Sequence, residues 1–156
     1  MTPSHYPPLN IHFIVEFCSK DLLEDRNFQS VQGLKISTDS SEGKELISYE
    51  NIILKRAYEP NSYLVEWCME CIKNRKKIPL DFTVKLLNAH HELLSAWKIE
   101  KAMPVAWGID ELHAQNTKIL IETIEVNPLR FNILDSNGKT IAPTAEHQKP
   151  PATKKR

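Results

Sequence analysis

Residues 46–77 read LISYENIILKRAYEPNSYLVEWCMECIKNRKK, and the spacing of their apolar side chains changes part-way along. Residues 46–55 follow a strand pattern. Beyond Pro60 the apolar residues recur at every third or fourth position, which is the spacing of one face of a helix. This stretch therefore predicts a strand followed by one α-helix over about residues 61–77. The apolar stripe of the helix consists of Leu64, Trp67, Cys68, Cys71 and Ile72.

The sequence also contains signals for both ends of this helix. Asn61 or Ser62 can cap its start, because a side-chain oxygen at that position accepts a hydrogen bond from a free backbone N–H. Basic residues near the other end suit the negative end of the helix dipole, and Pro79 stops the helix. These basic residues are Lys73, Arg75, Lys76 and Lys77.

Short strand patterns lie on both sides of the helix. Residues 10–17 alternate apolar and polar side chains, which is typical of a half-buried strand. Gly33 interrupts a second strand pattern, and we expect a bulge or bend there. A turn over residues 88–92 joins two strands into a hairpin, and Pro104 suits an edge or bulged strand. The expected strands span residues 10–17, 28–37, 46–55, 82–87, 94–99, 102–107 and 118–126, with room for a short further strand over 128–134.

These patterns predict a mainly β fold, a small antiparallel β-barrel or sandwich with the one α-helix packed on it. Three prolines within residues 1–9 indicate an N-terminal arm. Residues 10–134 are expected to form the β-barrel domain, with a loop over residues 38–45. The proline-rich and basic composition of residues 135–156 predicts a flexible tail.

The charge balance limits the classes of function. The 156 residues are enough for one domain with its own core. Twenty basic and 20 acidic residues give a net charge of zero, which removes the whole-chain basic field that drives non-specific nucleic-acid binding. This net charge of zero is the sum of two parts with opposite charge. Residues 128–156 hold six basic and two acidic residues, net +4, and residues 1–127 hold 14 basic and 18 acidic residues, net −4. We therefore expect a mildly acidic body whose basic tail docks on an acidic neighbour.

Several other classes are disfavoured by composition. No apolar run approaches the roughly 18–20 residues that span a bilayer, and the N-terminus lacks the features of a secretory signal. We therefore expect a protein made in the cytoplasm, without a membrane partner. Three cysteines argue against a disulfide framework, and four scattered glycines argue against a Gly-rich phosphate-binding loop.

The cysteines raise the question of redox or metal chemistry. Trp67, Cys68 and Cys71 resemble the Trp-Cys-x-x-Cys of thioredoxin-like enzymes, but that chemistry needs the first cysteine at a helix N-terminus. Cys68 falls inside the predicted helix, on its apolar stripe. A zinc site that adds His90 and His91 is also disfavoured, because adjacent side chains of an extended backbone point to opposite sides. We expect two core cysteines and two exposed turn histidines, with a thiol-redox or zinc protein as the remote alternative.

The acidic, basic and aromatic residues that could contribute to a functional site each have a structural explanation instead. Glu122 and Glu125 lie three apart on a predicted strand and so face opposite sides, which favours surface or interface positions over an acid–base pair. Residues 154–156 are expected to be a solvated tail end. The sequence therefore predicts no catalytic, cofactor-binding or metal-binding residue, and no enzyme. Core anchor positions are expected for Trp67, Trp97 and Trp107.

Seven segments, in order, resemble the phage tail tube protein family, whose members form the inner tube of contractile phage tails and phage-tail-like injection systems. The resemblance covers about residues 6–127. The matching segments are Tyr6-Pro7-Pro8 with residues 11–17, Phe28–Leu34 (FQSVQGL), Ile52–Arg56 (IILKR), Trp67, Trp97, Ala102–Trp107 (AMPVAW), and Leu112, Ala114 and residues 119–125.

The resemblance implies a fold like the tube proteins and like the haemolysin-coregulated protein of type VI secretion. It implies that six subunits close a ring and that rings stack into a hollow tube inside a contractile sheath. The implied partners are further copies of the chain, the sheath, the hub or baseplate and spike proteins, and effector cargo in the lumen. Strands of adjacent subunits would join into one inner surface, which removes exposed sheet edges. The implied role is structural, within an injection particle or phage tail, without specific nucleic-acid binding.

Two departures from the family pattern qualify this implication. The family often has a longer, Gly-rich hairpin before the Leu-Lys-Arg strand, which contacts the neighbouring ring, whereas only residues 38–50 fill this gap here. A first-layer adaptor ring between hub and tube is therefore the alternative. Family members usually end near Asn127, so the C-terminal extension is open to a hub, tube-end or cargo contact.

Overall fold

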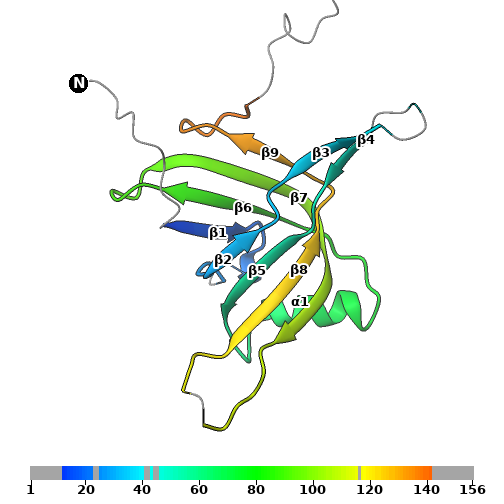
Figure 1. The fold of residues 1–156 in the computed structure, drawn as a ribbon, viewed down its shortest axis with the longest axis vertical. Coiled ribbons are helices and arrows are strands. Elements are labelled where there is room, and N and C mark those ends of the chain that lie inside the picture. The colour runs from blue at the N-terminus through cyan, green and yellow to red at the C-terminus, as the bar shows by residue number, and fades with distance from the viewer. Residues whose placement is uncertain (1–11, 23–24, 41–42, 44–45, 116, 142–156) are drawn as a thin grey trace, which may run out of the picture.

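The computed structural model of the chain describes residues 12–22, 25–40, 43, 46–115 and 117–141. Within these residues the chain is mainly β with one α-helix, which confirms the predicted fold class (Figure 1). The elements are β1 (Phe13–Phe17), the 3-10 helix η1 (Lys20–Leu22), β2 (Ser30–Gln32), β3 (Ile36–Asp39), β4 (Leu46–Tyr49), β5 (Ile52–Ala57), α1 (Tyr63–Ile72), β6 (Leu80–Leu87), β7 (Leu93–Ile109), β8 (Ile121–Asn127) and β9 (Arg130–Leu134).

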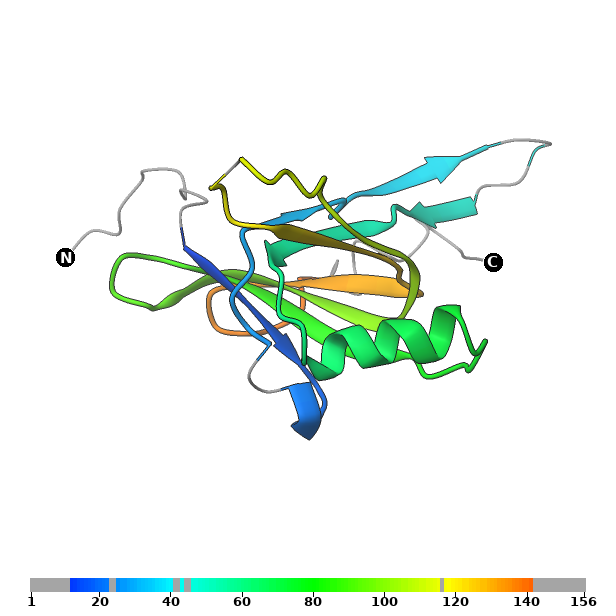
Figure 2. The same cartoon turned by 90° about the horizontal axis from the view of Figure 1, so that it is seen from below.

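The strands form a folded-over antiparallel sheet. Its order is β1-β6-β7-β8-β5-β2, and β9 pairs with β7 beside this path. The first half of β7 pairs with β6 and β9, and its second half pairs with β8, so one long strand passes through both layers (Figure 2). The two ends of the path, β1 and β2, do not pair with each other. The fold is therefore a sandwich rather than a closed barrel.

The long strand β7 replaces the two strands that were predicted over residues 94–99 and 102–107. Lys101 adopts a φ of 51°, and the register with β8 shifts between Pro104 and Ala106. Proline is tolerated at such an irregularity because its missing N–H breaks no regular ladder there. The bulge near Pro104 is thus confirmed, but the separation into two strands is wrong because the chain bends without leaving the sheet.

Gly33 divides the strand that was predicted over residues 28–37. Its φ is +101°, and a Cβ atom there would lie 2.0 Å from the backbone oxygen of Asn51. Only glycine permits this conformation together with this close approach. The chain turns out of the main sheet, and β3 pairs with β4 in a separate two-stranded sheet. The strand predicted over residues 46–55 is divided in the same way, because β4 pairs with β3 in the small sheet while β5 pairs with β2 and β8 in the main one.

The helix α1 begins as predicted and ends earlier. Ser62 is the N-cap, and its Oγ accepts a hydrogen bond from the backbone N of Val65 at 3.1 Å. The helix ends at Ile72 rather than near residue 77, because Arg75 adopts a left-handed φ of 57° and the backbone turns back. The Trp67 indole N–H then donates to the carbonyl of Ile78 at 2.7 Å, which holds the returning chain against the helix. The basic residues that were expected at the helix end, Lys73 to Lys77, therefore lie beyond the last turn of α1.

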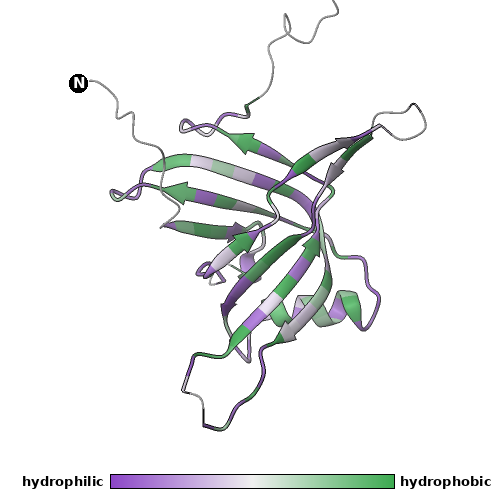
Figure 3. Cartoon of the chain, viewed as in Figure 1, coloured by the Kyte–Doolittle hydropathy of each residue, from purple (hydrophilic) through white to green (hydrophobic). Residues whose placement is uncertain are grey.

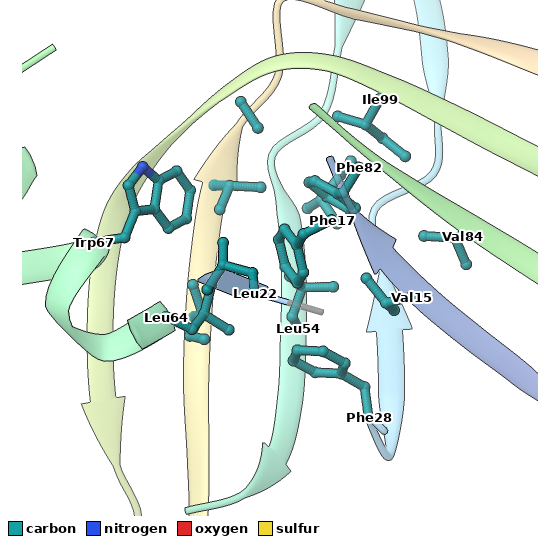
Figure 4. Close-up of a cluster of buried hydrophobic side chains, with 14 of the residues drawn as sticks. Val15, Phe17, Leu22, Phe28, Leu54, Leu64, Trp67, Phe82, Val84 and Ile99 are labelled. Carbon is teal, nitrogen blue, oxygen red and sulfur yellow. The ribbon is translucent and has the colours of Figure 1, made fainter. Parts of the chain in front are cut away.

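Apolar side chains of both layers and of α1 meet in one core (Figure 4). The alternation that predicted the strands is visible as bands of opposite hydropathy along them (Figure 3). Burying one such aliphatic or aromatic side chain contributes about 1.5–3 kcal/mol, so the shared core joins the layers into one domain. Labelled members of the core are Val15, Phe17, Leu22, Phe28, Leu54, Leu64, Trp67, Phe82, Val84 and Ile99.

The described C-terminal residues form a turn beside β9. The short strand that the sequence allowed over residues 128–134 is confirmed as β9. After it, the backbone N of Asp135 donates to the carbonyl of Lys139 at 2.8 Å, and Thr140 pairs with Leu134. The N-terminal arm and residues 142–156, which include the basic tail end, lie outside the described residues.

Candidate functional site

Cys68 and Cys71 are buried on the inner face of α1, as the sequence predicted. Both are free thiols, and the Cys71 Sγ lies 3.8 Å from the carbonyl oxygen of Ile78. Burial, together with the negative charge of Glu122, raises the pKa of Cys68 to about 12. A reactive cysteine needs a lowered pKa and access to solvent, and Cys68 has neither. The pair therefore fits the core interpretation and not the thiol-redox alternative.

His90 and His91 lie in the exposed turn between β6 and β7, as predicted. The backbone N of His90 donates to Asn88 Oδ1 at 2.8 Å, while the His91 ring nitrogen Nδ1 lies 3.0 Å from Nε2 of His12. Within the described ranges, no group of three His, Cys, Asp or Glu side chains is arranged to hold a metal ion. The proximity of His12 and His91 was missed, because 79 residues separate them and no local pattern links them.

Glu122 is the clearest error of the sequence interpretation. The residue was expected at the surface, but its side chain is 0% exposed. Its Oε1 accepts from Arg56 Nε at 2.6 Å, and its Oε2 accepts from the Trp107 indole N–H at 2.7 Å. Glu125 does point to the opposite face, as predicted, where its Oε2 accepts from Asn51 Nδ2 at 2.8 Å. A buried carboxylate is acceptable only with such partners.

Arg56 is the centre of this buried polar network. Its guanidinium also donates to Asp25 and, at 2.6 Å, to the Oγ of the N-cap residue Ser62. Burial by itself lowers the pKa of Arg56, but the hydrogen bonds and charges of Asp25 and Glu122 outweigh burial and raise it. The Arg56 network joins β5, β8, the start of α1 and the chain before β2. All its charged groups are paired internally, so it positions structural elements and offers no group for catalysis.

An apolar hollow of about 300 Å³ opens between β2 and the layer of β1 and β6. Its lining contains no acid, base or thiol. A catalytic pocket needs convergent polar or titratable groups, which this hollow lacks. The aromatic lining includes Trp97, which is half-buried and packs on the core, as does Trp107.

Two projecting segments that lie far apart on the molecule carry exposed apolar side chains. The β3–β4 hairpin carries Ile36, Leu46 and Ile47, which are 47%, 55% and 65% exposed. The loop between β7 and β8 carries Leu112 and Ile119, which are 73% and 66% exposed. The hairpin and this loop project from opposite ends of the long axis (Figure 1). Apolar groups gathered on a projecting surface are typical of interaction sites.

The outward face of β1, β6, β7 and β9 is polar and carries both charges. Lys85 Nζ lies 2.7 Å from a carboxylate oxygen of Glu16, and Arg130 Nε lies 3.2 Å from one of Glu100. These pairs bridge neighbouring strands and are partly exposed, so they contribute little to stability. No helix among the described residues is long and apolar enough to cross a membrane.

Residues 9–132 match the family described as T4-like virus tail tube protein gp19. This chain belongs to that family. The match confirms the resemblance seen in the sequence and extends it into β9, so that the tail tube domain does not end near Asn127. No curated protein sequence matches this tail tube protein.

Solved structures share the tail tube fold. A chain of the anti-feeding prophage baseplate, which was symmetrised six-fold, has a TM-score of 0.68 and 20% identity over 85% of this chain and 99% of that one. A chain of the sheath–tube complex of the PVC extracellular contractile injection system has a TM-score of 0.67 and 24% identity, with coverages of 84% and 93%. Hcp1 from Flavobacterium johnsoniae has a TM-score of 0.57 and 13% identity, with coverages of 83% and 97%. The family match shows that this chain is a tail tube protein, and the likeness to these structures shows that it shares their fold.

Proposed function

We propose that this tail tube protein forms hexameric rings that stack into the inner tube of a contractile injection system or myophage-like tail. The tube would be a hollow conduit for a spike and effector cargo, inside a sheath and above a hub or baseplate. The family match over residues 9–132 carries this proposal. It is a structural role, for which no catalytic residue, cofactor or metal ion is needed.

The strand arrangement supports ring formation. β1 and β2 end the main sheet, and the edge of β9 away from β7 is covered only at its end, among the described residues, by Thr140 and Ile141, so strand edges remain for pairing with another copy. Edge-to-edge pairing around a closed ring removes such edges and uses one repeated heterologous contact. The polar outward face with Glu16, Lys85, Glu100 and Arg130 suits a water-filled lumen, because it is wettable and holds both charges.

The β3–β4 hairpin supports stacking of one ring on another. Its exposed apolar residues project away from the core, where a neighbouring molecule can cover them. Replacing Ile47 with Asp would place a charge in that contact and leave the core intact. Ser48→Asp is the matched control, because it adds the same charge to the same exposed strand without removing an apolar side chain.

Sizing with light scattering and negative-stain microscopy of the purified full chain tests both steps. We expect ring-sized particles for the wild type and both variants, and stacked rings for the wild type and Ser48→Asp but not for Ile47→Asp. A strictly monomeric wild-type protein, alone and with its hub proteins, would refute ring formation. Stacking by Ile47→Asp equal to the wild type would refute the role of the hairpin.

A first-layer adaptor ring between hub and tube is the second candidate. It is favoured by the short β3–β4 hairpin, whose strands have four residues each. Such a ring contacts a different protein on one side, so a long self-stacking hairpin is unnecessary there. A cryo-EM map of the intact particle separates the two roles: this chain in every ring along the tube excludes the adaptor, and its restriction to the first layer excludes the main tube.

A further inference from the structure

Two histidines from distant parts of the sequence meet at one end of the sandwich. His12 precedes β1, and His91 lies in the turn between β6 and β7. The Nδ1 atom of His91 lies 3.0 Å from Nε2 of His12, and the ring centroids are 4.8 Å apart with the planes at 75°. His91 is exposed and His12 is half-buried, so ions in solution can reach the pair.

Hydrogen bonds hold the backbone around both histidines. Asn88 Oδ1 accepts from the backbone N of His90 at 2.8 Å and of Glu92 at 2.9 Å, which fixes the turn around His91. His91 itself has a φ of 63°, an uncommon conformation for a residue other than glycine. The backbone N of Leu87 donates to the carbonyl of His12 at 2.9 Å and anchors the backbone of His12. When a ligand binds this His12–His91 pair, the backbone is already in place and only the two rings need to turn.

We propose that the His12–His91 pair binds one divalent transition-metal ion, with Ni²⁺ and Cu²⁺ favoured. Imidazole nitrogens bind these metals at about 2.1 Å, so two of them at a right angle lie about 3.0 Å apart, whereas tetrahedral sites need about 3.4 Å. The observed 3.0 Å is the separation of two hydrogen-bonded ring nitrogens, and it is closer to the right-angle separation than to the tetrahedral one, so a square-planar or octahedral site needs the smaller displacement. Tetrahedral Zn²⁺ is therefore the poorer fit.

Binding replaces the hydrogen that the two rings share. The ring that donates this hydrogen changes tautomer, so that its one hydrogen moves to the nitrogen that faces away from the metal, while the other ring already carries its hydrogen there; both facing nitrogens then offer a lone pair, and no net proton is released. The rings turn until both lone pairs converge on the ion, and water fills the remaining positions, since the described residues offer no third protein ligand.

This site departs from the sequence expectation of no metal ligand and is independent of the proposed tube function. Titration calorimetry of the untagged full chain with NiCl₂, repeated with CuCl₂, tests it. We expect one ion per chain, and an affinity at least about tenfold weaker in His12→Gln and in His91→Gln, because each variant loses the chelate. His90→Gln is the matched control, since it changes the neighbouring exposed histidine outside the pair.

Two further measurements test whether the metal ion binds at this pair rather than elsewhere. His5 lies outside the described residues, so His5→Gln is measured as well. Unchanged affinity in His91→Gln, or an equal loss in His90→Gln or His5→Gln, overturns the proposal. Thermal unfolding shows whether each variant is folded and whether the metal ion stabilises it. NiCl₂ should raise the Tm of the wild type and of His90→Gln but not of His91→Gln. Equal shifts in all three proteins also overturn it.

Discussion

Removing the cation at the centre of the Arg56 network should destabilise this tail tube protein severely. In Arg56→Met the side chain retains its apolar volume, but Asp25 and Glu122 lose their cation while remaining 5% and 0% exposed. Breaking a buried ion pair by removing one partner costs about 3–5 kcal/mol. Because Arg56 serves two carboxylates and the Ser62 cap, we expect a loss near 5 kcal/mol, at the upper end of that range.

Lys55→Met is the matched control for this variant. Lys55 precedes Arg56 on β5 and is exposed on the other face, so the same charge disappears without an effect on the core. Such a surface substitution changes the free energy of unfolding by only about 0.5 kcal/mol. The difference between adjacent positions therefore isolates the buried network from the change in net charge.

Urea unfolding followed by tryptophan fluorescence measures both variants at one protein concentration, because assembly also stabilises the folded state. The triple variant Arg56→Met, Asp25→Asn, Glu122→Gln removes the orphaned charges and should recover part of the loss, since neutral replacements of buried ion pairs are tolerated. The reasoning is refuted if Arg56→Met loses no more stability than Lys55→Met. It is also refuted if the triple variant is less stable than Arg56→Met.

Two further predictions concern the backbone and the thiols. Gly33→Ala should cost more than about 2 kcal/mol in urea unfolding, because its Cβ would meet the Asn51 carbonyl, while Gly108→Ala, with open space around the new Cβ, should stay near the wild type. Equal stability of the two variants would show that Gly33 is not required. In thiol titration at pH 8, one thiol per folded chain should react quickly, that of exposed Cys18, while Cys68 and Cys71 react only on unfolding. Rapid reaction of three thiols in the folded protein would contradict the buried placement.

Local patterns were enough to identify many elements of this fold. Alternating side chains predicted β1 and the β6–β7 hairpin, and the apolar stripe from Leu64 to Ile72 predicted α1 with its Ser62 cap. These features depend on neighbours within a few residues, which the sequence displays directly. The breaks at Gly33 and Pro104 were predicted as well, but the sequence did not show how far each one redirects the chain. Contacts with distant strands determine whether the chain leaves the sheet, as at Gly33, or only bends within it, as near Pro104.

The family of this protein and its fold class were therefore decided by the sequence alone, because ordered motifs and periodic apolar residues survive without any three-dimensional information. Only the tertiary structure decided which distant polar groups meet. Glu122 was assigned to the surface or an interface because it and Glu125 face opposite sides of a strand and cannot form an acid–base pair, and its burial depends on Arg56, 66 residues away. His12 and His91 likewise become neighbours only because β1 pairs with β6. Periodicity predicts which face of an element is buried, whereas the partners of a buried charge depend on how the chain folds back on itself.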